Sequence, residues 1–223
     1  MTIGAKRTYV AELLGTAVLL ATVVGSGEMG LRITNGNAGL TLLANAIATG
    51  AVLYVLVLGL GPISGAHFNP VITMIEAASH RLPRARVAGY LLAQLSGAFA
   101  GVLLAHAMFG LPLIEHSHHA RSSLGEILGE AVATFGLWLV IATASRAKPS
   151  SVPGAVALYI VAAYWFTSST SFANPAVTLA RSFSDTFAGI RHVDVLPFIG
   201  AQIVGGTLAA LLIAWLLPKS QPA

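Results

Sequence analysis

SGAHFNPV at residues 64–71 and STSFANPA at residues 169–176 are the two stretches that decide how this chain folds. The first contains Asn69-Pro70-Val71 and the second contains Asn174-Pro175-Ala176. Asparagine is a preferred helix N-cap, and proline is tolerated at the first helical position, where its missing N–H would lack a partner anyway. We therefore predict that each Asn-Pro pair starts a helix. The alternative, that both only start ordinary buried helices, explains less, because the two motifs occupy corresponding places in the two halves.

The lengths of the segments around these motifs place them inside a membrane. Hydrophobic residues make up 56% of the chain, charged residues make up 9%, and the mean hydropathy is +0.80. A span needs roughly 20 apolar residues, and six segments approach or exceed that length: about 9 to 27, 38 to 62, 87 to 109, 124 to 145, 152 to 168 and 196 to 217. The segments from Asn69 to about Ala78 and from Asn174 to about Arg181 cover only roughly 15 Å, half a bilayer. We predict an all-α integral membrane protein with six transmembrane helices and two re-entrant half-helices.

Three features recur in the same order in both halves of the chain. A span bearing a glutamate comes first, with Glu12 and Glu130, the Asn-Pro motif follows, and an Ala-Gln pair with a glycine close behind comes last, at residues 93–97 and 201–205. Each half holds three full spans, an odd number, so the second copy enters the membrane from the opposite face. We expect one channel domain over residues 1–223, with inverted repeats at about 1–110 and 120–218.

The basic residues are divided unevenly between the two ends of a six-span bundle. Eight fall on one side and four on the other. The first set is Lys6, Arg7, Arg81, Arg84, Arg86, Arg146, Lys148 and Lys219, and the second is Arg32, Arg121, Arg181 and Arg191. Basic residues favour the cytoplasmic side, so both termini are predicted to be cytoplasmic, in the inner (plasma) membrane. The net charge of +4 is explained by this topology and not by binding to nucleic acid, and the first span has no cleavage pattern of a signal peptide.

The paired motifs, together with the Glu12 and Glu130 spans, resemble the major intrinsic protein family of aquaporins and aquaglyceroporins. The resemblance covers nearly the whole chain and implies a channel, usually a homotetramer with one pore per subunit, that acts without a cofactor. As N-caps, Asn69 and Asn174 would turn their NH₂ donors to the lumen, so a permeating water must point its hydrogens outward from the centre. The positive ends of the two half-helices would repel cations and protons there.

The resemblance also implies a selectivity filter of four positions on the outer side. Counting from the two asparagines gives Thr49, Ala162, Ser171 and Val177, with valine where the family usually has arginine. The ring so predicted is open, with no aromatic and no charged side chain. A valine at this place resembles the AqpS-type bacterial aquaglyceroporins associated with arsenic-resistance genes, which implies neutral arsenous acid, and methylated arsenicals, as solutes. The chain has no cysteine that would trap a metalloid.

Several polar residues keep more than one interpretation. Arg181 lies four residues after Val177, within reach of the same face, and either guides solutes in the outer vestibule, pairs with Asp185, or points outward to solvent. His67 either lines the cytoplasmic approach or ties its loop together. Intramembrane carboxylates are functional candidates by default, but in the resembled family such glutamates act as clamps for the re-entrant loops, which we favour for Glu12 and Glu130.

The function predicted from the sequence is a passive channel for small uncharged solutes in lipid, such as glycerol-like polyols and metalloid acids, with water. The second interpretation keeps the fold but makes it mainly a water channel. A third is a proton-coupled transporter that uses Glu12, Glu130 and His67. An enzyme is the least favoured class, because no nucleophile, base and orienting acid occur together. His116, His118 and His119 form a histidine-rich loop for which we predict no metal site.

Overall fold

The computed structural model describes residues 4–217 and consists, over that range, of helices and their connections. Six helices are long and apolar enough to cross a membrane, two of them together with the 3-10 turn that precedes them. Their bounds are α1 Ala5–Ile33, α2 Ala38–Ser64, α4 Val87–Phe109, α5 Leu124–Ala147, α6 Val152–Phe166 and α8 His192–Leu216. The predicted all-α class with six spans is confirmed, and α6 is the shortest of them, as expected. Short 3-10 turns, η1 Arg84–Arg86 and η2 Pro149–Ser151, precede α4 and α6.

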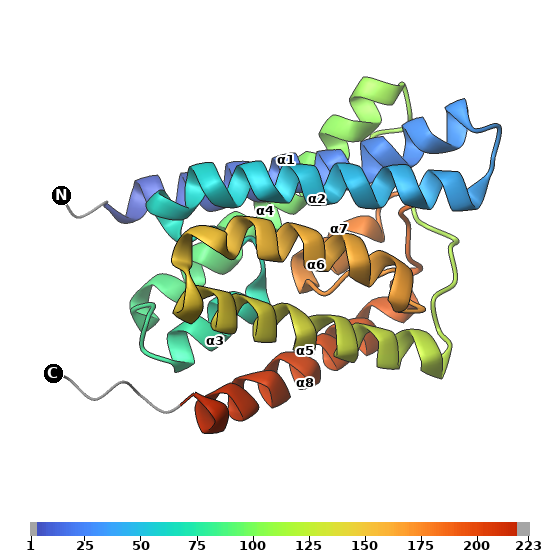
Figure 1. Ribbon diagram of the computed structural model, residues 1–223. Coiled ribbons are helices and arrows are strands. Elements are labelled where there is room, and N and C mark those ends of the chain that lie inside the picture. The colour runs from blue at the N-terminus through green and yellow to red at the C-terminus, as the bar shows by residue number, and fades with distance from the viewer. Residues whose placement is uncertain (1–3, 218–223) are drawn as a thin grey trace, which may run out of the picture.

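Two short helices complete the bundle at the predicted places. They are α3 Pro70–Ala78 and α7 Pro175–Arg181. In each, the Asn is the N-cap and the Pro is the first helical residue, because the side-chain oxygen of Asn69 or Asn174 accepts from the backbone N–H two residues later. Figure 1 shows α3 and α7 lying between the long helices, from opposite ends of the bundle.

Close packing of helices depends on a glycine at the same place in each half. Gly97 of α4 lies against the backbone of α1, where an added Cβ would be 2.3 Å from the carbonyl oxygen of Leu13. Gly205 of α8 lies against α5, where a Cβ would be 2.1 Å from the carbonyl oxygen of Ala131. Small residues let helix backbones approach closely in membranes. The glycines behind the two Ala-Gln pairs therefore have the same packing role, although the repeat boundaries themselves stay a prediction.

The larger set of basic residues gathers at one end of the bundle. The start of α1, the link between α3 and α4, and the link between α5 and α6 all lie at that end, and α8 also ends there (Figure 1). These segments carry the basic residues of the larger set that the structure describes; Lys219 lies outside the described residues. The division of charge read from the sequence is therefore matched by the fold.

Gly205→Ala should destabilise the protein by about 1–3 kcal/mol, because the new methyl group meets backbone that cannot move aside cheaply. Thermal unfolding in detergent, followed by size-exclusion chromatography, would measure the loss. Gly200→Ala is the matched control on the same helix, since a Cβ there meets nothing within 4 Å. Equal melting temperatures for the two variants would contradict this account of the α5–α8 contact.

Candidate functional site

The two Asn-Pro loops meet at the centre of the bundle and hold each other by crossed hydrogen bonds. Asn69 Nδ2 donates to the carbonyl oxygen of Ala173 at 2.7 Å, and Asn174 Nδ2 donates to the carbonyl oxygen of Phe68 at 2.7 Å. Each amide oxygen is occupied by the first turn of its own half-helix. An NH₂ group has two donors, so one N–H of each asparagine fastens the opposite loop, and its second N–H makes no hydrogen bond to the residues that the structure describes.

Both loops use the left-handed backbone region before their asparagine. Positive φ angles occur at Ala66 (50°) and Phe68 (49°) in the first loop, and at Ser171 (53°) and Ala173 (50°) in the second. These positions are three and one residues before the asparagine in both loops. Residues other than glycine adopt this region at a cost of about 1–3 kcal/mol each, and keep it only where the surroundings impose it. The loops must therefore be held from outside.

Glu12 of α1 holds the first loop. Its Oε1 accepts from Ser64 Oγ at 2.6 Å and from the His67 N–H at 3.0 Å. Its Oε2 accepts from the Phe68 N–H and from Gln94 Nε2, both at 2.8 Å. The carboxylate is fully buried, and all four bonds come from protein donors.

Glu130 of α5 holds the second loop in the same way. Its two oxygens accept from the N–H groups of Phe172 and Ala173, both at 2.8 Å, and Gln202 Nε2 adds a bond of 2.6 Å. It is also fully buried. Neither glutamate is among the described residues that line the cavity of the site. These contacts are those expected of a clamp on the re-entrant loop.

A cavity of about 690 Å³ runs past the asparagines. Its centre is formed by both loops, and helices of both halves supply the walls. The lining includes most of the residues predicted for a pore, namely Asn69, Asn174, His67, Thr49, Ser171, Val177 and Arg181. The remaining wall is largely apolar, with side chains such as Leu53, Val57, Ile72, Leu137, Ile141, Val156 and Ile160.

The structure corrects the prediction that Ala162 belongs to the selectivity filter. It lies on the exposed outer face of α6 and not on the cavity, while Tyr164, two residues later, is buried and lines it. The Tyr164 hydroxyl lies 3.2 Å from Thr49 Oγ1 of α2, within hydrogen-bond distance. Counting back from Asn174 assumed the usual length between helix and loop, and two positions along a helix turn a side chain by about 200°. The lining therefore does include an aromatic side chain.

Arg181 ends α7 with its side chain against the cavity. It is only 3% exposed, and its Nε donates to the carbonyl oxygen of Ala188. Its Cζ lies 3.3 Å from the centre of the Phe172 ring. Two of the three interpretations are thereby excluded, because Arg181 is not solvated and Asp185 instead accepts from the His118 N–H at 2.9 Å. The sequence predicted that the outer end of the cavity has no charged side chain. That prediction is wrong, since the guanidinium of Arg181 lies one helical turn beyond Val177.

Arg121 is a residue that sequence reasoning counted only as a surface charge. It is 7% exposed and fastens the second loop from outside, with Nε bonded to the Gly189 carbonyl at 2.9 Å and Nη1 to the Ser169 carbonyl at 3.3 Å. Its Cζ lies 5.0 Å from the Phe172 ring. Burial lowers the pKa of its guanidinium, and Glu126 and Glu130 oppose that shift. No motif marked Arg121 or Phe172 in advance, because their partners come from distant segments.

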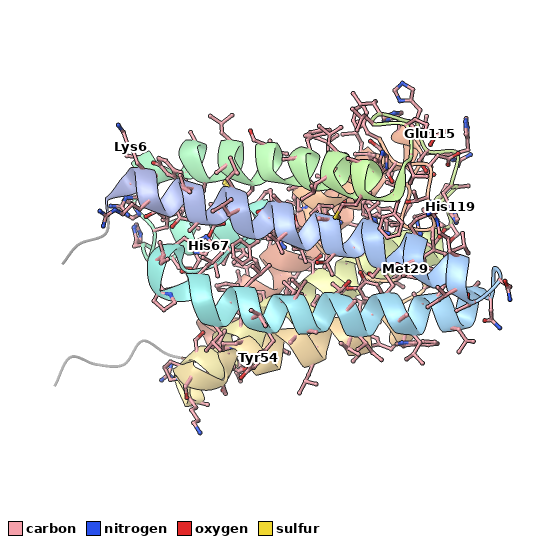
Figure 2. All side chains as sticks on the ribbon, turned by 90° about the horizontal axis from the view of Figure 1, so that it is seen from above. Lys6, Met29, Tyr54, His67, Glu115 and His119 are labelled. Atoms are coloured by element: carbon pink, nitrogen blue, oxygen red, sulfur yellow. The ribbon has the colours of Figure 1, made fainter. Side chains whose placement is uncertain are left out.

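His67 lines the cavity and also contacts residues near its own loop. Its Nδ1 lies 3.0 Å from Thr73 Oγ1, while its ring packs 5.0 Å from that of Tyr90. Figure 2 shows His67 toward the end of the bundle that carries Lys6, while Met29, Glu115 and His119 lie toward the opposite end. His67 therefore belongs to the half of the cavity that opens on the basic end.

The histidine-rich loop is not gathered around one point. His116 Nδ1 lies 2.6 Å from His192 Nε2 at the surface, and His118 bonds to Asp185 through its backbone. Among the described residues no group of three or more histidine, aspartate or glutamate side chains could hold a metal ion.

Comparisons with known proteins agree with the fold. The profile of the family described as Major intrinsic protein matches residues 1–168. The chain is 52% identical to "Aquaglyceroporin AqpS" of Rhizobium meliloti over 97% of this chain and 92% of that protein. It is 30% identical to "Probable aquaporin AqpM" of Archaeoglobus fulgidus over 97% of each chain. The structure is similar to that of the aquaglyceroporin from Plasmodium falciparum, with a TM-score of 0.74, 20% identity, and coverage of 96% of this chain and 98% of that one.

Glu130→Gln should destabilise the second loop, because an NH₂ group then faces N–H donors that the carboxylate now accepts. An unsatisfied buried donor costs about 1–3 kcal/mol, so we expect a melting temperature in detergent lower by several degrees. Glu28→Gln is the control, since Glu28 pairs with Arg32 at the surface, where a pair contributes about 1 kcal/mol or less. A variant as stable as the control would show that the clamp is dispensable.

Proposed function

The chain belongs to the major intrinsic protein family, whose members are channels and not enzymes, and from that premise we propose that it conducts small uncharged solutes passively. The proposed solutes are glycerol-like polyols and metalloid acids such as arsenous acid, with water. The single observation that carries this proposal is the crossed pair of Asn69 and Asn174 beside a cavity with a mostly apolar wall.

The centre of the cavity suits a neutral solute and rejects a charged one. Each asparagine keeps one N–H donor beyond the bond to the opposite loop, so a solute oxygen that accepts from both is held without a protein acceptor for its own hydrogens. The N-termini of α3 and α7 add partial positive charge of about half an elementary charge each. A cation or a proton relay is disfavoured at that point.

We propose that Thr49, Tyr164, Ser171, Val177 and Arg181 form the outer filter. Ser171 Oγ is buried and has no hydrogen-bond partner, so a passing hydroxyl group would supply one. Arg181 supplies the hydrogen-bond donors and the positive charge that the apolar Val177 does not provide. Tyr164 gives an apolar face for carbon atoms. A polyol has carbon atoms that suit the apolar part of this lining and hydroxyl groups that suit its polar part.

Arsenous acid fits the same wall, because it is an uncharged molecule with several hydroxyl groups. The support for it is the valine at residue 177, the 52% identity to "Aquaglyceroporin AqpS" and a chain without cysteine. Methylated arsenicals would place their methyl group against the same apolar face.

Water conduction is the second candidate. It is favoured by Tyr164 and Arg181, which bring a bulky ring and a guanidinium to a lining that counting along the sequence had given only small and medium side chains. Proton-coupled transport has less support, because the Glu12 and Glu130 carboxylates are buried, bonded to loop donors and not part of the cavity lining.

We further propose an inner (plasma) membrane location with both termini cytoplasmic, and a homotetramer. The basic end of the bundle supports the orientation. The tetramer follows from the resemblance to the family, and the apolar side chains exposed on the outer faces of the helices supply surface for lipid or for neighbouring subunits.

Stopped-flow light scattering on proteoliposomes would test the proposal by comparing the entry of water, glycerol and arsenous acid with that in empty vesicles. We expect all three to enter faster through the protein, in proportion to the gradient and without response to an imposed pH gradient. Conduction of water alone would support the second candidate. Uptake that saturates and follows the pH gradient would instead indicate a transporter.

Val177→Arg should narrow the neck and slow glycerol and arsenous acid more than water. A second guanidinium would face Arg181 across about one helical turn, so both bulk and positive charge increase where solutes pass. The same vesicle assay measures the ratio of the permeabilities, with Val177→Ala as a control that removes bulk. Equal slowing of all solutes would remove Val177 from the filter.

A further inference from the structure

A second cluster of polar side chains lies at the inner end of the cavity, near the basic end of the bundle. Trp138 of α5 contributes its indole to the lining, and Arg81 and Glu76, which come from the end of α3 and the turn after it, line the same stretch. The other α5 residues of the lining are apolar beside Trp138 and polar toward the basic end, namely Leu137, Ile141 and Ala142, then Ser145 and Arg146. Trp138 therefore lies where the apolar wall of the cavity gives way to polar side chains.

Trp138 carries a donor that has no acceptor. Its side chain is 2% exposed, and its Nε1 is buried without a hydrogen-bond partner. Buried polar groups are nearly always paired, and an exception calls for an explanation in function or in a missing partner. Since Trp138 lines the cavity through which solutes are proposed to pass, a solute oxygen is a suitable acceptor.

Arg81 has the most exposed side chain of the three. Its Nε and Nη2 donate to the two oxygens of Glu76 at 2.7 and 3.1 Å, and its Cζ lies 5.3 Å from the centre of the Trp138 ring. The Arg81 side chain is 55% exposed, whereas that of Glu76 is 17% exposed. The guanidinium thus links α3 of the first half with α5 of the second and keeps one side open to solvent.

A second cavity of about 500 Å³ lies against the same residues. Gly65, His67, Glu76 and Arg81 line both this cavity and the pore cavity, so they form the wall between the two. The far side of the second cavity is lined by residues such as Pro62, Arg86 and Tyr90. It offers room into which the Arg81 side chain can turn when it leaves the Trp138 ring.

We infer that Trp138, Arg81 and Glu76 form an inner binding site for neutral polyhydroxylated molecules. Arg81 turns off the indole, the Trp138 N–H and the guanidinium donate to solute oxygens, and the Glu76 carboxylate accepts from solute hydroxyls. This inference rests on the proposed function, and it adds a place of recognition separate from the asparagine pair and the outer filter. Water, with one oxygen, gains less from three converging groups than a polyol does.

Trp138→Phe is the decisive variant, because phenylalanine keeps a ring for Arg81 and removes only the indole N–H and some bulk. We expect glycerol permeability in proteoliposomes to fall about threefold to tenfold, the value of roughly one hydrogen bond, while water permeability stays within about twofold of the wild type. Trp165→Phe, on the exposed face of α6, is the matched control and should leave both permeabilities unchanged. Thermal unfolding in detergent checks that Trp138→Phe is folded.

Arg81→Gln gives an independent measurement on the same site. It should lower the ratio of glycerol to water permeability, whereas Arg84→Gln, in the following 3-10 turn, should not. Equal loss of glycerol and water flux in Trp138→Phe, or an unchanged ratio in both Trp138→Phe and Arg81→Gln, would overturn the inference. Failure of the wild-type protein to conduct glycerol would instead overturn the proposed function, so the two failures are distinguishable.

Discussion

Two buried carboxylates make the rest of this structure possible. A loop without helical structure inside a membrane exposes backbone N–H groups that lipid cannot satisfy. Glu12 and Glu130 accept those N–H groups, and the glutamines of α4 and α8 in turn donate to the carboxylates. The left-handed residues of both loops stay in place because of these bonds. Only then can two half-helices begin at the centre of the bundle and direct their N-termini at one point.

The same constraint explains why the site is duplicated. Each half supplies a glutamate, a loop and an asparagine, and each asparagine fastens the loop of the other half. Neither loop is complete alone, so the two halves must dock before the centre of the cavity exists. The glycines at 97 and 205 allow that docking by letting α4 and α8 approach α1 and α5 closely. Packing, loop geometry and the proposed exclusion of ions are thus parts of one arrangement.

The outer half of the cavity departs from the symmetry of the centre. Arg181 reaches the cavity from the last residue of α7, and Phe172 lies beside both its guanidinium and that of Arg121. Two buried arginines at the outer end of the cavity supply positive charge. The sequence had predicted none there, because Val177 occupies the position where the family usually has arginine. The proposed filter therefore combines the Tyr164 ring with guanidinium donors, even though the residue that follows the second motif is apolar.

The sequence by itself determined the six spans, the two half-helices and the asparagines that cap them, because these depend on local signals: segment length, apolar content and N-cap chemistry. The same local signals marked Glu12 and Glu130, since a charged residue inside a span is conspicuous. Only the tertiary structure decided which side chains line the outer neck. Tyr164 lines it in place of Ala162, and Arg181 points inward. The direction of a side chain depends on the length of a loop and on partners outside its own helix, such as Thr49 for Tyr164 and Ala188 for Arg181, which spacing along the chain does not encode.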